Sequence, residues 1–385
     1  MRNSSFSRKR RAHGRAATAL AAVAWSCGIA AIGAIDPERT PSQYIRDRWD
    51  SSNGFQGGPV YAISQTVDGY LWVAAERGLV RFDGLTFRLF QPMESASGLD
   101  SVAVQIAPAS DGPLWARLRR ADLVRSRNGA YEHIPSDPGS PMLLTTAMAP
   151  ANDGTMLVAD ERRGIFRARA ARFDTIVAKS LLPRSFVISI AQTPDGDMWL
   201  GTRDAGLVRV REGQVAFVTD GLPDQKINSL VADGRDQLWI GTDNGVVRWD
   251  GQRVTHSHVP SALDRVRVTA MMKDRDANVW IGTADGLLRV NGRGLASHDR
   301  RMPGAGVTAL FEDRDGNLWI GTTTGIERWR DGAFTAYPEV RTVTMGGDAG
   351  PVFVDTDGRV WFAPSTGGLY WLRDGRVSRV TEAGL

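Results

Sequence analysis

One stretch of sequence decides how this chain folds, because the chain repeats it: Trp239-Ile240-Gly241-Thr242-Asp243-Asn244-Gly245-Val246-Val247-Arg248. The tetrapeptide Trp-(Ile/Leu)-Gly-Thr occurs four times, and each copy is followed by Gly-(Leu/Val/Ile) and then Arg. Weaker copies extend the pattern in both directions, which gives eight units, centred on Trp72, Trp115, Leu157, Trp199, Trp239, Trp280, Trp319 and Trp361. The period of about 40 residues is the length of one four-stranded propeller blade. The repeat therefore predicts an all-β protein, a single β-propeller of four-stranded antiparallel blades.

Residues 226–258 show how one unit predicts four strands. Residues 226–232 alternate between apolar and polar side chains, and residues 238–242 form the nearly continuous apolar run of a buried strand. Residues 246–249 return the chain, and residues 253–258 are expected to form the outermost strand. Turns rich in Asp, Asn and Gly join these segments, as antiparallel hairpins require.

The recurring residues have structural reasons to recur. The Trp is expected to pack between neighbouring blades, where its large area supplies much of the burial. The Gly two places later permits the close approach of an adjoining strand. The Arg recurs in seven of the eight units, which favours a role in holding blades together over ligand binding: Arg81, Arg125, Arg167, Arg209, Arg248, Arg289 and Arg328.

The domain organisation follows from the extent of the repeat. Residues 57–385 are assigned to the propeller, and residues 35–56 to a lead-in whose segment Tyr44–Trp49 is expected to complete the last blade and close the ring. The units run on without a linker, so we expect an eight-bladed ring; a seven-bladed ring with one extra unit is the alternative. The chain ends at Glu382-Ala383-Gly384-Leu385, which resembles the lead-in to another blade and indicates truncation at the C-terminus.

The first 34 residues are expected to form a secretory signal peptide. Six basic side chains precede an Ala-rich apolar run, which ends in small residues at Ala34, and the segment contains no acidic residue. An uncleaved anchor in the inner membrane is the alternative. The formal net charge of the whole chain is +4, so the remainder carries −2, and a nucleic-acid partner is not expected. Cys27 is the one cysteine and lies within this segment, so the mature chain would have no disulfide.

The repeat Trp-Ile-Gly-Thr-x-x-Gly-Leu-x-Arg, preceded by Asp-x-x-Gly-x-Leu, resembles the two-component regulator propeller repeat. Residues 42–63, from Ser42-Gln43-Tyr44 to Ala62-Ile63, also resemble the opening of sensors of this family. The resemblance covers about residues 41–385 and is weakest around Trp115 and Leu157, where the Gly-Thr pair is missing. It implies an extracytoplasmic sensor region like those of bacterial hybrid sensor kinases, histidine kinases and diguanylate cyclases. The implied partner is a signalling domain or protein.

Candidate metal ligands are better explained by turns and an exposed strand. The runs beginning at Asp274 and Asp313 imitate the start of a calcium loop, but each lacks the glutamate at position twelve and falls at the first hairpin turn of its unit. His256 and His258 share a strand face without a third ligand nearby. No catalytic residue, metal site or cofactor is therefore expected, and the chain is not expected to be an enzyme.

The candidate ligand-binding residues lie on the turns between the second and third strands. In a propeller these turns and the loops entering each blade surround one mouth of the central channel. Uniform strands with unlike loops are typical of a binding scaffold. The predicted set is Glu76, Arg77, Arg162, Arg163, Arg203, Asp204, Asp243, Asn244, Asp285, Thr323 and Thr324, with Glu161 and Thr366 beside them. Solvated turn polarity is the alternative for any single residue.

Three functions are compatible with these features of the sequence. The favoured one is a periplasmic ligand-sensing module without catalysis, which binds a small molecule such as a saccharide or peptide. A protein-interaction scaffold with no small ligand is the first alternative. A propeller-type lyase or glycan-cleaving enzyme is the second, and it would need a His or carboxylate constellation at the channel mouth that the sequence does not display.

Overall fold

The computed structural model describes residues 35–36, 39, 43–90, 102–109, 112–120, 122–127, 129–134, 144–169, 172–291, 294–299, 306–332, 351–363, 368–373 and 376–380. Within these residues the strands form eight four-stranded antiparallel sheets, which confirms the all-β prediction and the count of eight units. The two helices found there are short 3-10 turns, η2 (Lys179–Leu181) and η3 (Ser261–Leu263). No helix in this part of the chain is long and apolar enough to span a membrane. The expected signal segment, residues 1–34, lies outside the described residues.

Six sheets follow the chain, each in the order of its four strands. They consist of β2 (Val60–Gln65), β3 (Leu71–Ala75), β4 (Gly78–Phe82) and β5 (Phe87–Phe90); β6 (Ala103–Pro108), β7 (Leu114–Leu118), β8 (Leu123–Arg127) and β9 (Ala130–His133); β10 (Thr145–Pro150), β11 (Met156–Asp160), β12 (Gly164–Arg169) and β13 (Arg172–Ala178); β14 (Val187–Gln192), β15 (Met198–Thr202), β16 (Leu207–Arg211) and β17 (Gln214–Val218); β18 (Ile227–Ala232), β19 (Leu238–Thr242), β20 (Gly245–Trp249) and β21 (Val254–Thr255); and β22 (Val268–Lys273), β23 (Val279–Thr283), β24 (Gly286–Asn291) and β25 (Gly294–Asp299).

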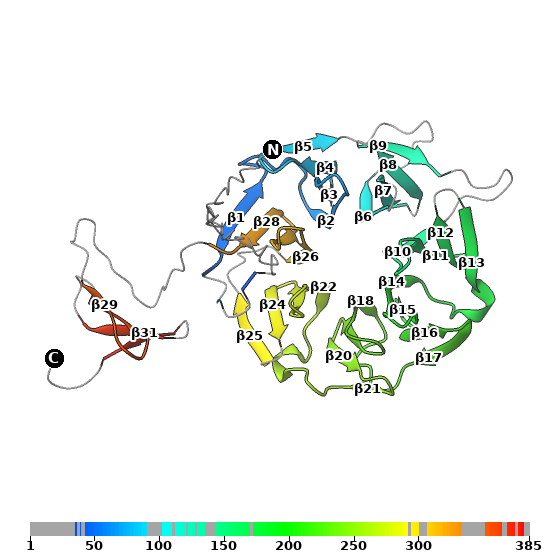
Figure 1. The fold of residues 1–385 in the computed structure, drawn as a ribbon. Helices are drawn as coiled ribbons and strands as arrows, with labels where there is room; N and C mark the ends of the chain where they lie inside the picture. Colours follow the sequence, from blue (N-terminus) through cyan, green and yellow to red (C-terminus); the bar gives the residue numbers. More distant parts are fainter. Residues whose placement is uncertain are drawn as a thin grey trace, which may run out of the picture. The chain divides into compact units, whose positions relative to one another are not determined.

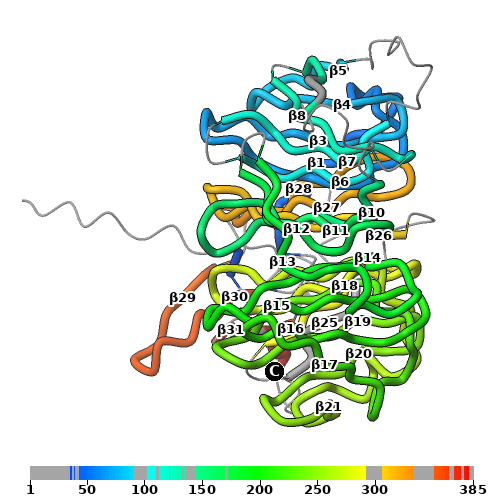
Figure 2. Tube along the Cα trace, turned by 90° about the vertical axis from the view of Figure 1, so that its right-hand side faces the viewer, coloured from blue at the N-terminus to red at the C-terminus, as the bar shows by residue number. Residues whose placement is uncertain are grey.

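The seventh sheet joins the two ends of the ring. It contains β26 (Val307–Glu312), β27 (Leu318–Thr322) and β28 (Gly325–Arg330), and its fourth strand is β1 (Ile45–Asp50) from the N-terminal side of the chain. β1 and β28 are antiparallel, with register from Ile45 opposite Arg330 to Asp50 opposite Gly325. The blue strand β1 lies beside the orange strands of this sheet in both views (Figures 1 and 2).

The first strand of each sheet packs on the first strand of the next, from β2 through β6, β10, β14, β18 and β22 to β26, and β26 packs back on β2. Among the described residues this makes a closed ring of seven blades (Figure 1). The glycine of the repeat shows the same closure. A Cβ on Gly241 would lie 2.6 Å from Val268 of the next blade, and one on Gly321 would lie 2.5 Å from Val60 of the first. The seventh blade therefore meets the first as closely as any consecutive pair.

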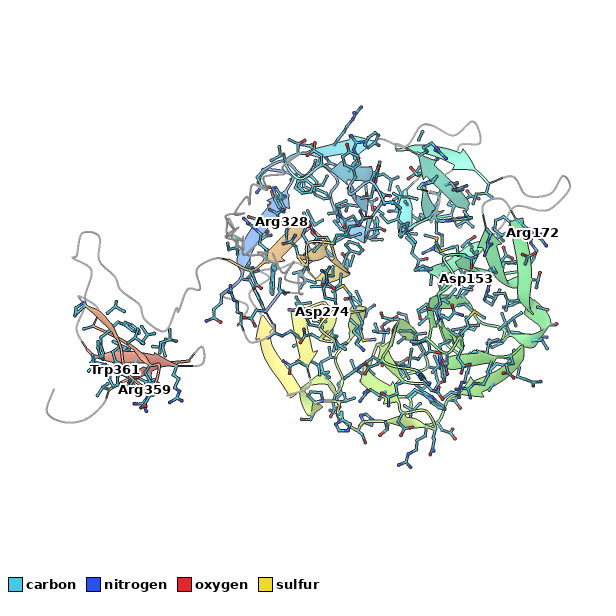
Figure 3. The ribbon with its side chains drawn as sticks, viewed as in Figure 1. Asp153, Arg172, Asp274, Arg328, Arg359 and Trp361 are labelled. Carbon is cyan, nitrogen blue, oxygen red and sulfur yellow. The ribbon has the colours of Figure 1, made fainter. Side chains whose placement is uncertain are left out.

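The eight units therefore do not form the eight-bladed ring that was expected. Seven sheets close the ring, which is the alternative arrangement, because β1 supplies the fourth strand of the sheet that contains Trp319. The eighth described sheet comprises β29 (Val352–Val354), β30 (Val360–Phe362), β31 (Tyr370–Arg373) and β32 (Arg376–Arg379), and its strands pair only with one another. Its central Trp361 donates to Asp355 over 2.8 Å, as in the ring units (Figure 3).

The core lies between blades, and the repeated Trp is at its centre. Trp199, Trp239, Trp280 and Trp319 are at most 4% exposed, and each packs with apolar side chains of the next blade. The indole N–H is often bonded to an Asp six residues earlier, as in Trp280 to Asp274 at 2.9 Å. A buried N–H without an acceptor would cost free energy, so the aspartate of the first turn stabilises the buried Trp.

The repeated Arg acts mainly within its own blade. Arg248 lies opposite Trp239 in the β19–β20 register, and its guanidinium carbon is 4.9 Å from the centre of the indole ring. Arg328 stands over Trp319 in the same way and also binds Asp47 of β1 at 2.8 Å (Figure 3). Arg209 is the member that bridges blades, because it binds Asp197 of its own blade and Asp236 of the next. The structural role expected of the repeated Arg is confirmed. It consists mainly of packing on the Trp of the same blade, and bonds between blades are a smaller part of it.

Candidate functional site

The predicted ligand-binding residues lie on one kind of turn, which joins the second strand of a blade to the third. They occupy the turns β3–β4 (Glu76, Arg77), β11–β12 (Glu161, Arg162, Arg163), β15–β16 (Arg203, Asp204), β19–β20 (Asp243, Asn244), β23–β24 (Asp285) and β27–β28 (Thr323, Thr324). Thr366 lies outside the described residues. Since strand order is the same in every blade, these turns lie at one end of the ring. We call this end the mouth face.

Backbone hydrogen bonds attach several of these turns to the loops that enter their blades. The amide of Glu76 donates to the carbonyl of Pro59 at 2.9 Å, that of Arg203 to Phe186 at 2.9 Å, and that of Thr323 to Gly306 at 3.2 Å. The mouth face therefore comprises both the turns and the entry loops. Side chains from the two sources lie close enough to act on one ligand.

The Thr of the repeat fixes the shape of each turn. The hydroxyl of Thr242 donates to the Gly245 carbonyl at 2.8 Å and accepts from the Asn244 amide at 3.1 Å. Thr202, Thr283 and Thr322 form the corresponding bonds. Asp160 takes this position in the unit that lacks Gly-Thr, and its carboxylate accepts from three backbone amides, those of Leu144, Arg162 and Arg163. The strands that flank these turns are equivalent in every blade, whereas the turns differ in length and in the side chains that follow the Thr position.

Asp243 is the most highly coordinated of the predicted residues. Its carboxylate accepts from Asn228 at 2.6 Å and from Lys226 at 3.0 Å, and Arg267 lies 3.4 Å away on the loop that enters the next blade. Burial opposes ionisation of Asp243, yet the bonds from Asn228 and Lys226 and the nearby positive charges outweigh it, so its pKa is lowered. Asn228 also donates to the Val268 carbonyl of the next blade at 2.9 Å. This cluster joins two blades and keeps Asp243 charged.

Arg203 and Asp243 lie on the equivalent turns of two adjacent blades, and each has its own partners. The guanidinium of Arg203 lies over the ring of Phe186, 4.8 Å from its centre, on the loop that enters its own blade. Asp243 turns toward Lys226 and Arg267 instead. Asn244 donates to the Pro223 carbonyl at 3.3 Å. Two adjacent sets of polar side chains therefore occupy this sector, rather than one joint set.

A second cross-blade contact on the mouth face was not predicted. Arg119 follows the Thr position of the second blade, and it binds the Glu76 carboxylate at 2.5 Å and the Tyr61 hydroxyl at 2.8 Å. Tyr61 in turn donates to Glu76. Arg119 holds the same repeat position as Arg203 and Asp243, but the loss of Gly-Thr in its unit hides that equivalence in the sequence.

The candidate metal ligands take part in turns and ion pairs. Asp313 accepts from the backbone of Asp315 and Asn317 and from the indole of Trp319, and Asp274 is bound in the same way (Figure 3). These bonds explain both aspartates as turn residues. Three other carboxylates lie close together, those of Asp195, Asp197 and Asp236. Arg209 and Arg211 neutralise that group, with contacts as short as 2.6 Å.

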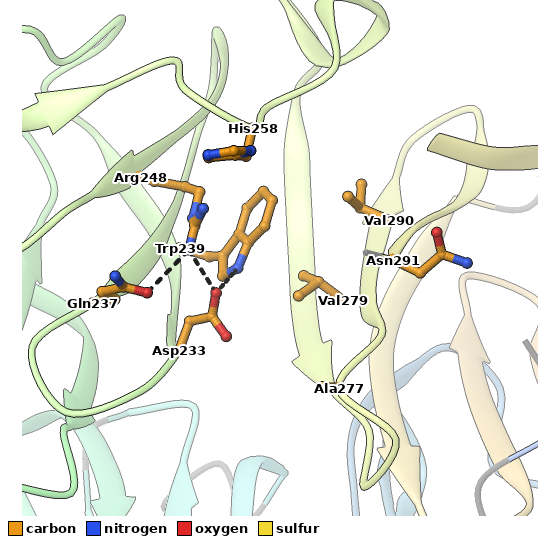
Figure 4. A pocket seen from close by; sticks show the side chains of 9 residues that line it. All are labelled: Asp233, Gln237, Trp239, Arg248, His258, Ala277, Val279, Val290 and Asn291. Carbon is orange, nitrogen blue, oxygen red and sulfur yellow. Dashed lines mark hydrogen bonds and ion pairs between the residues drawn. The ribbon is translucent and has the colours of Figure 1, made fainter. Parts of the chain in front are cut away.

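The histidine pair does not share a strand face. The outer strand β21 comprises only Val254–Thr255, so the expected strand over residues 253–258 is too long. Ser257 turns back to bond with Thr255, and His258 has a left-handed backbone with φ of 61°. His256 lies 3.9 Å from Asp264, whereas His258 lies beside Trp239 in a pocket between two blades (Figure 4).

Comparison with known proteins finds one family whose repeats match part of this β-propeller. Three segments of the chain, residues 181–204, 221–244 and 301–324, match the family described as two component regulator propeller. These matches confirm the resemblance to the two-component regulator propeller repeat family. A search of curated proteins finds no match.

Solved structures show the same fold. The extracellular domain of BT3049, a proposed hybrid two-component system of B. thetaiotaomicron, is 21% identical with a TM-score of 0.66, over 89% of this chain and 49% of that one. The extracellular domain of BT4673 from the same organism is 20% identical with a TM-score of 0.58, over 89% of this chain and 47% of that one. Virginiamycin B lyase from Staphylococcus aureus is 15% identical with a TM-score of 0.60, over 75% of this chain and 99% of that one. The chain thus spans about half the length of the sensor domains it matches.

Proposed function

We propose that this propeller is the extracytoplasmic, ligand-sensing part of a two-component or related signalling system. It binds a small polar molecule at the mouth face and passes its occupancy to a signalling domain or partner protein. The repeat family and the similar sensor domains support the sensing role. The mouth face supports ligand binding, because equivalent turns on successive blades there display different charged side chains.

The single observation that carries the proposal is the cluster around Asp243. The Lys226 ammonium lies 3.0 Å from the Asp243 carboxylate, and the Arg267 guanidinium of the adjacent blade lies 3.4 Å from it. All three side chains remain partly exposed. Donors and acceptors on adjacent loops suit a polyhydroxylated or zwitterionic ligand, such as a saccharide or a short peptide. Such a ligand would contact both blades, so its binding would be sensitive to their separation.

Alanine substitution at this cluster tests the proposal. A screen of saccharides and short peptides by thermal stabilisation identifies a ligand, since a compound that binds only the native state raises the melting temperature. Asp243→Ala and Arg203→Ala are then expected to lose calorimetric binding, because Asp243 organises Lys226 and Arg267 while Arg203 presents a guanidinium on the neighbouring turn. Both variants should keep cooperative melting, because these turn side chains contribute little packing.

Arg172→Ala, at an exposed side chain of the outer strand β13 and off the mouth face, is the control and should retain affinity. If both Asp243→Ala and Arg203→Ala bind like the unchanged protein, the site does not lie in this sector. If turn substitutions all around the mouth face leave affinity unchanged, ligand binding at this face is refuted.

Export is the remaining part of the proposal, and it rests on the sequence of residues 1–34. The basic segment followed by an Ala-rich run supports cleavage near Ala34. Intact-mass analysis of the protein exported from a Gram-negative host is expected to show a chain that lacks Arg8–Arg15. A mature chain that retains this segment would favour a membrane anchor.

A further inference from the structure

A pocket of about 490 Å³ lies between the blade of β18–β21 and the blade of β22–β25, away from the mouth turns (Figure 4). We call it the Trp239 cleft. One side is formed by Trp239, Arg248 and Asp233, and the other by Val279 and Val290. His258, on the connection between the two blades, lies at one end of the cleft (Figure 4). Its size is within the range of about 300–1,000 Å³ that is typical of small-molecule sites.

The cleft lies beside Val290, at a position that carries an aromatic ring in three ring blades and a smaller residue in the other four, Ser126, Ala168, Val210 and Val290. The position after the repeated Arg is Trp249, Trp329 or Phe82 in three blades. Each of these rings packs on the repeated Trp of the preceding blade, at centroid distances of 5.1, 6.3 and 5.4 Å. The same position is Val290 beside Trp239, and the space is left open. Ser126 beside Trp72 leaves a smaller pocket of about 200 Å³ in the same way.

The polar groups of the cleft favour an anion. Both oxygens of Asp233 are already used: Oδ1 by Lys273 at 2.6 Å, and Oδ2 by Trp239 at 2.9 Å and Arg248 at 2.8 Å. Arg248 and Lys273 thus set two positive charges against one carboxylate. His258 is exposed, and its left-handed backbone places it against the indole and the guanidinium (Figure 4). The Nε of Arg248 is buried without a hydrogen-bond partner among the described residues, so it is an open donor to which an anion could bind.

The apolar groups of the cleft favour a ring. Trp239 lines the cleft from one blade and Val279 and Val290 from the next, and little of each side chain is exposed, at 4%, 2% and 4%. Aromatic rings of Trp and Phe occupy the corresponding space at three other interfaces of this same propeller. A free aromatic ring of similar size therefore fits the cleft.

We propose that the Trp239 cleft binds a small carboxylate carrying one aromatic ring, with the ring between Trp239 and Val290 and the carboxylate toward Arg248 and His258. The site is separate from the mouth face. Its ligand would contact two blades at once and would stabilise their interface.

Phenylacetate is the probe, and Val290→Trp is the deciding variant. Calorimetric titration of the full chain is expected to show binding of phenylacetate, and Val290→Trp is expected to weaken it at least about tenfold, a loss readily resolved by titration. Trp is accommodated at the equivalent positions 249 and 329, so this variant should fold. Val290→Phe, which matches Phe82, provides the same test if the larger ring disturbs folding.

Three matched measurements separate the components of the proposal. Ser126→Phe, which fills the smaller pocket, and Arg172→Ala, on the exposed outer strand β13, should both leave phenylacetate affinity unchanged. 2-Phenylethanol, which has the ring without the charge, should bind at least about tenfold more weakly than phenylacetate. Absence of phenylacetate binding by the unchanged protein, undiminished binding by both Val290 variants, or equal binding of the alcohol would overturn the proposal.

Discussion

Replacing Trp319 with alanine is expected to lower the free energy of unfolding by about 3–5 kcal/mol, the usual cost of deleting a large buried aromatic side chain. Trp319 is 2% exposed and lies where the ring closes. It packs on Trp49 at a centroid distance of 5.8 Å and on Phe82 of the first blade at 5.4 Å. The substitution would also remove the 2.7 Å bond from the indole to Asp313. Urea unfolding followed by circular dichroism measures the change.

Two further substitutions calibrate this result. Trp239→Ala removes the same repeat residue beside an open cleft, so it should cost less than Trp319→Ala, toward the lower end of the range. Leu85→Ala, at a side chain that is 90% exposed, should be neutral. A Trp319→Ala protein within about 0.5 kcal/mol of the unchanged one, the range of ordinary surface substitutions, would contradict a central packing role for the repeated Trp.

The blade could be predicted from sequence because the residues that determine its fold lie within a single repeat unit. The Trp, the Gly and the Asp of the first turn act within one unit or against its immediate neighbour, so their spacing displays their roles. The Gly241 contact with Val268 and the Trp280 bond to Asp274 are both of this local kind. The one strand that was predicted too long, over residues 253–258, ends early because the chain turns at Ser257.

The number of blades in the ring could not be predicted in this way. It depends on the pairing of β1 with β28, in which Asp47 binds Arg328 from 281 residues away. The number of units can be counted from the repeat, but the repeat does not show which unit pairs with the N-terminal strand. Seven blades close because that strand completes the sheet of Trp319 rather than the sheet of Trp361.

The candidate site was predictable as a set of turns but not as a set of contacts. Strand order alone brings the turns after each Thr position to one end of the ring. Which side chains meet there is decided across blades, as in the approach of Arg267 to Asp243 and of Arg119 to Glu76. The Trp239 cleft was missed for a different reason. Its signal is Val290, which draws attention only when the equivalent residues Phe82, Trp249 and Trp329 are seen to pack as aromatic rings on the repeated Trp.

Removal of β1 is expected to have the largest effect on this protein. A chain beginning at Ser51 lacks all six residues that pair with β28, the ion pairs of Asp47 with Arg328 and Arg330, and the Trp49 side chain that packs on Trp319. The loss should exceed the cost of about 3–5 kcal/mol expected for a single large aromatic side chain. β28 would also become an exposed edge, which favours association between chains. We expect a lowered melting temperature and oligomers in size-exclusion chromatography.

Addition of the missing strand in trans makes the test specific. A peptide of residues 43–56 contains β1 with its flanking residues, and an extended peptide can pair with an open sheet edge. This peptide should restore the melting temperature and the monomeric state of the chain that begins at Ser51, whereas a peptide of the same composition in scrambled order should not. A chain that begins at Ile35 is the control and should melt like the full chain, because it keeps the buried Ile35 and the contacts of Asp36 and Arg39 with the ring. If the chain beginning at Ser51 melts at the same temperature as this control, β1 does not hold the ring closed.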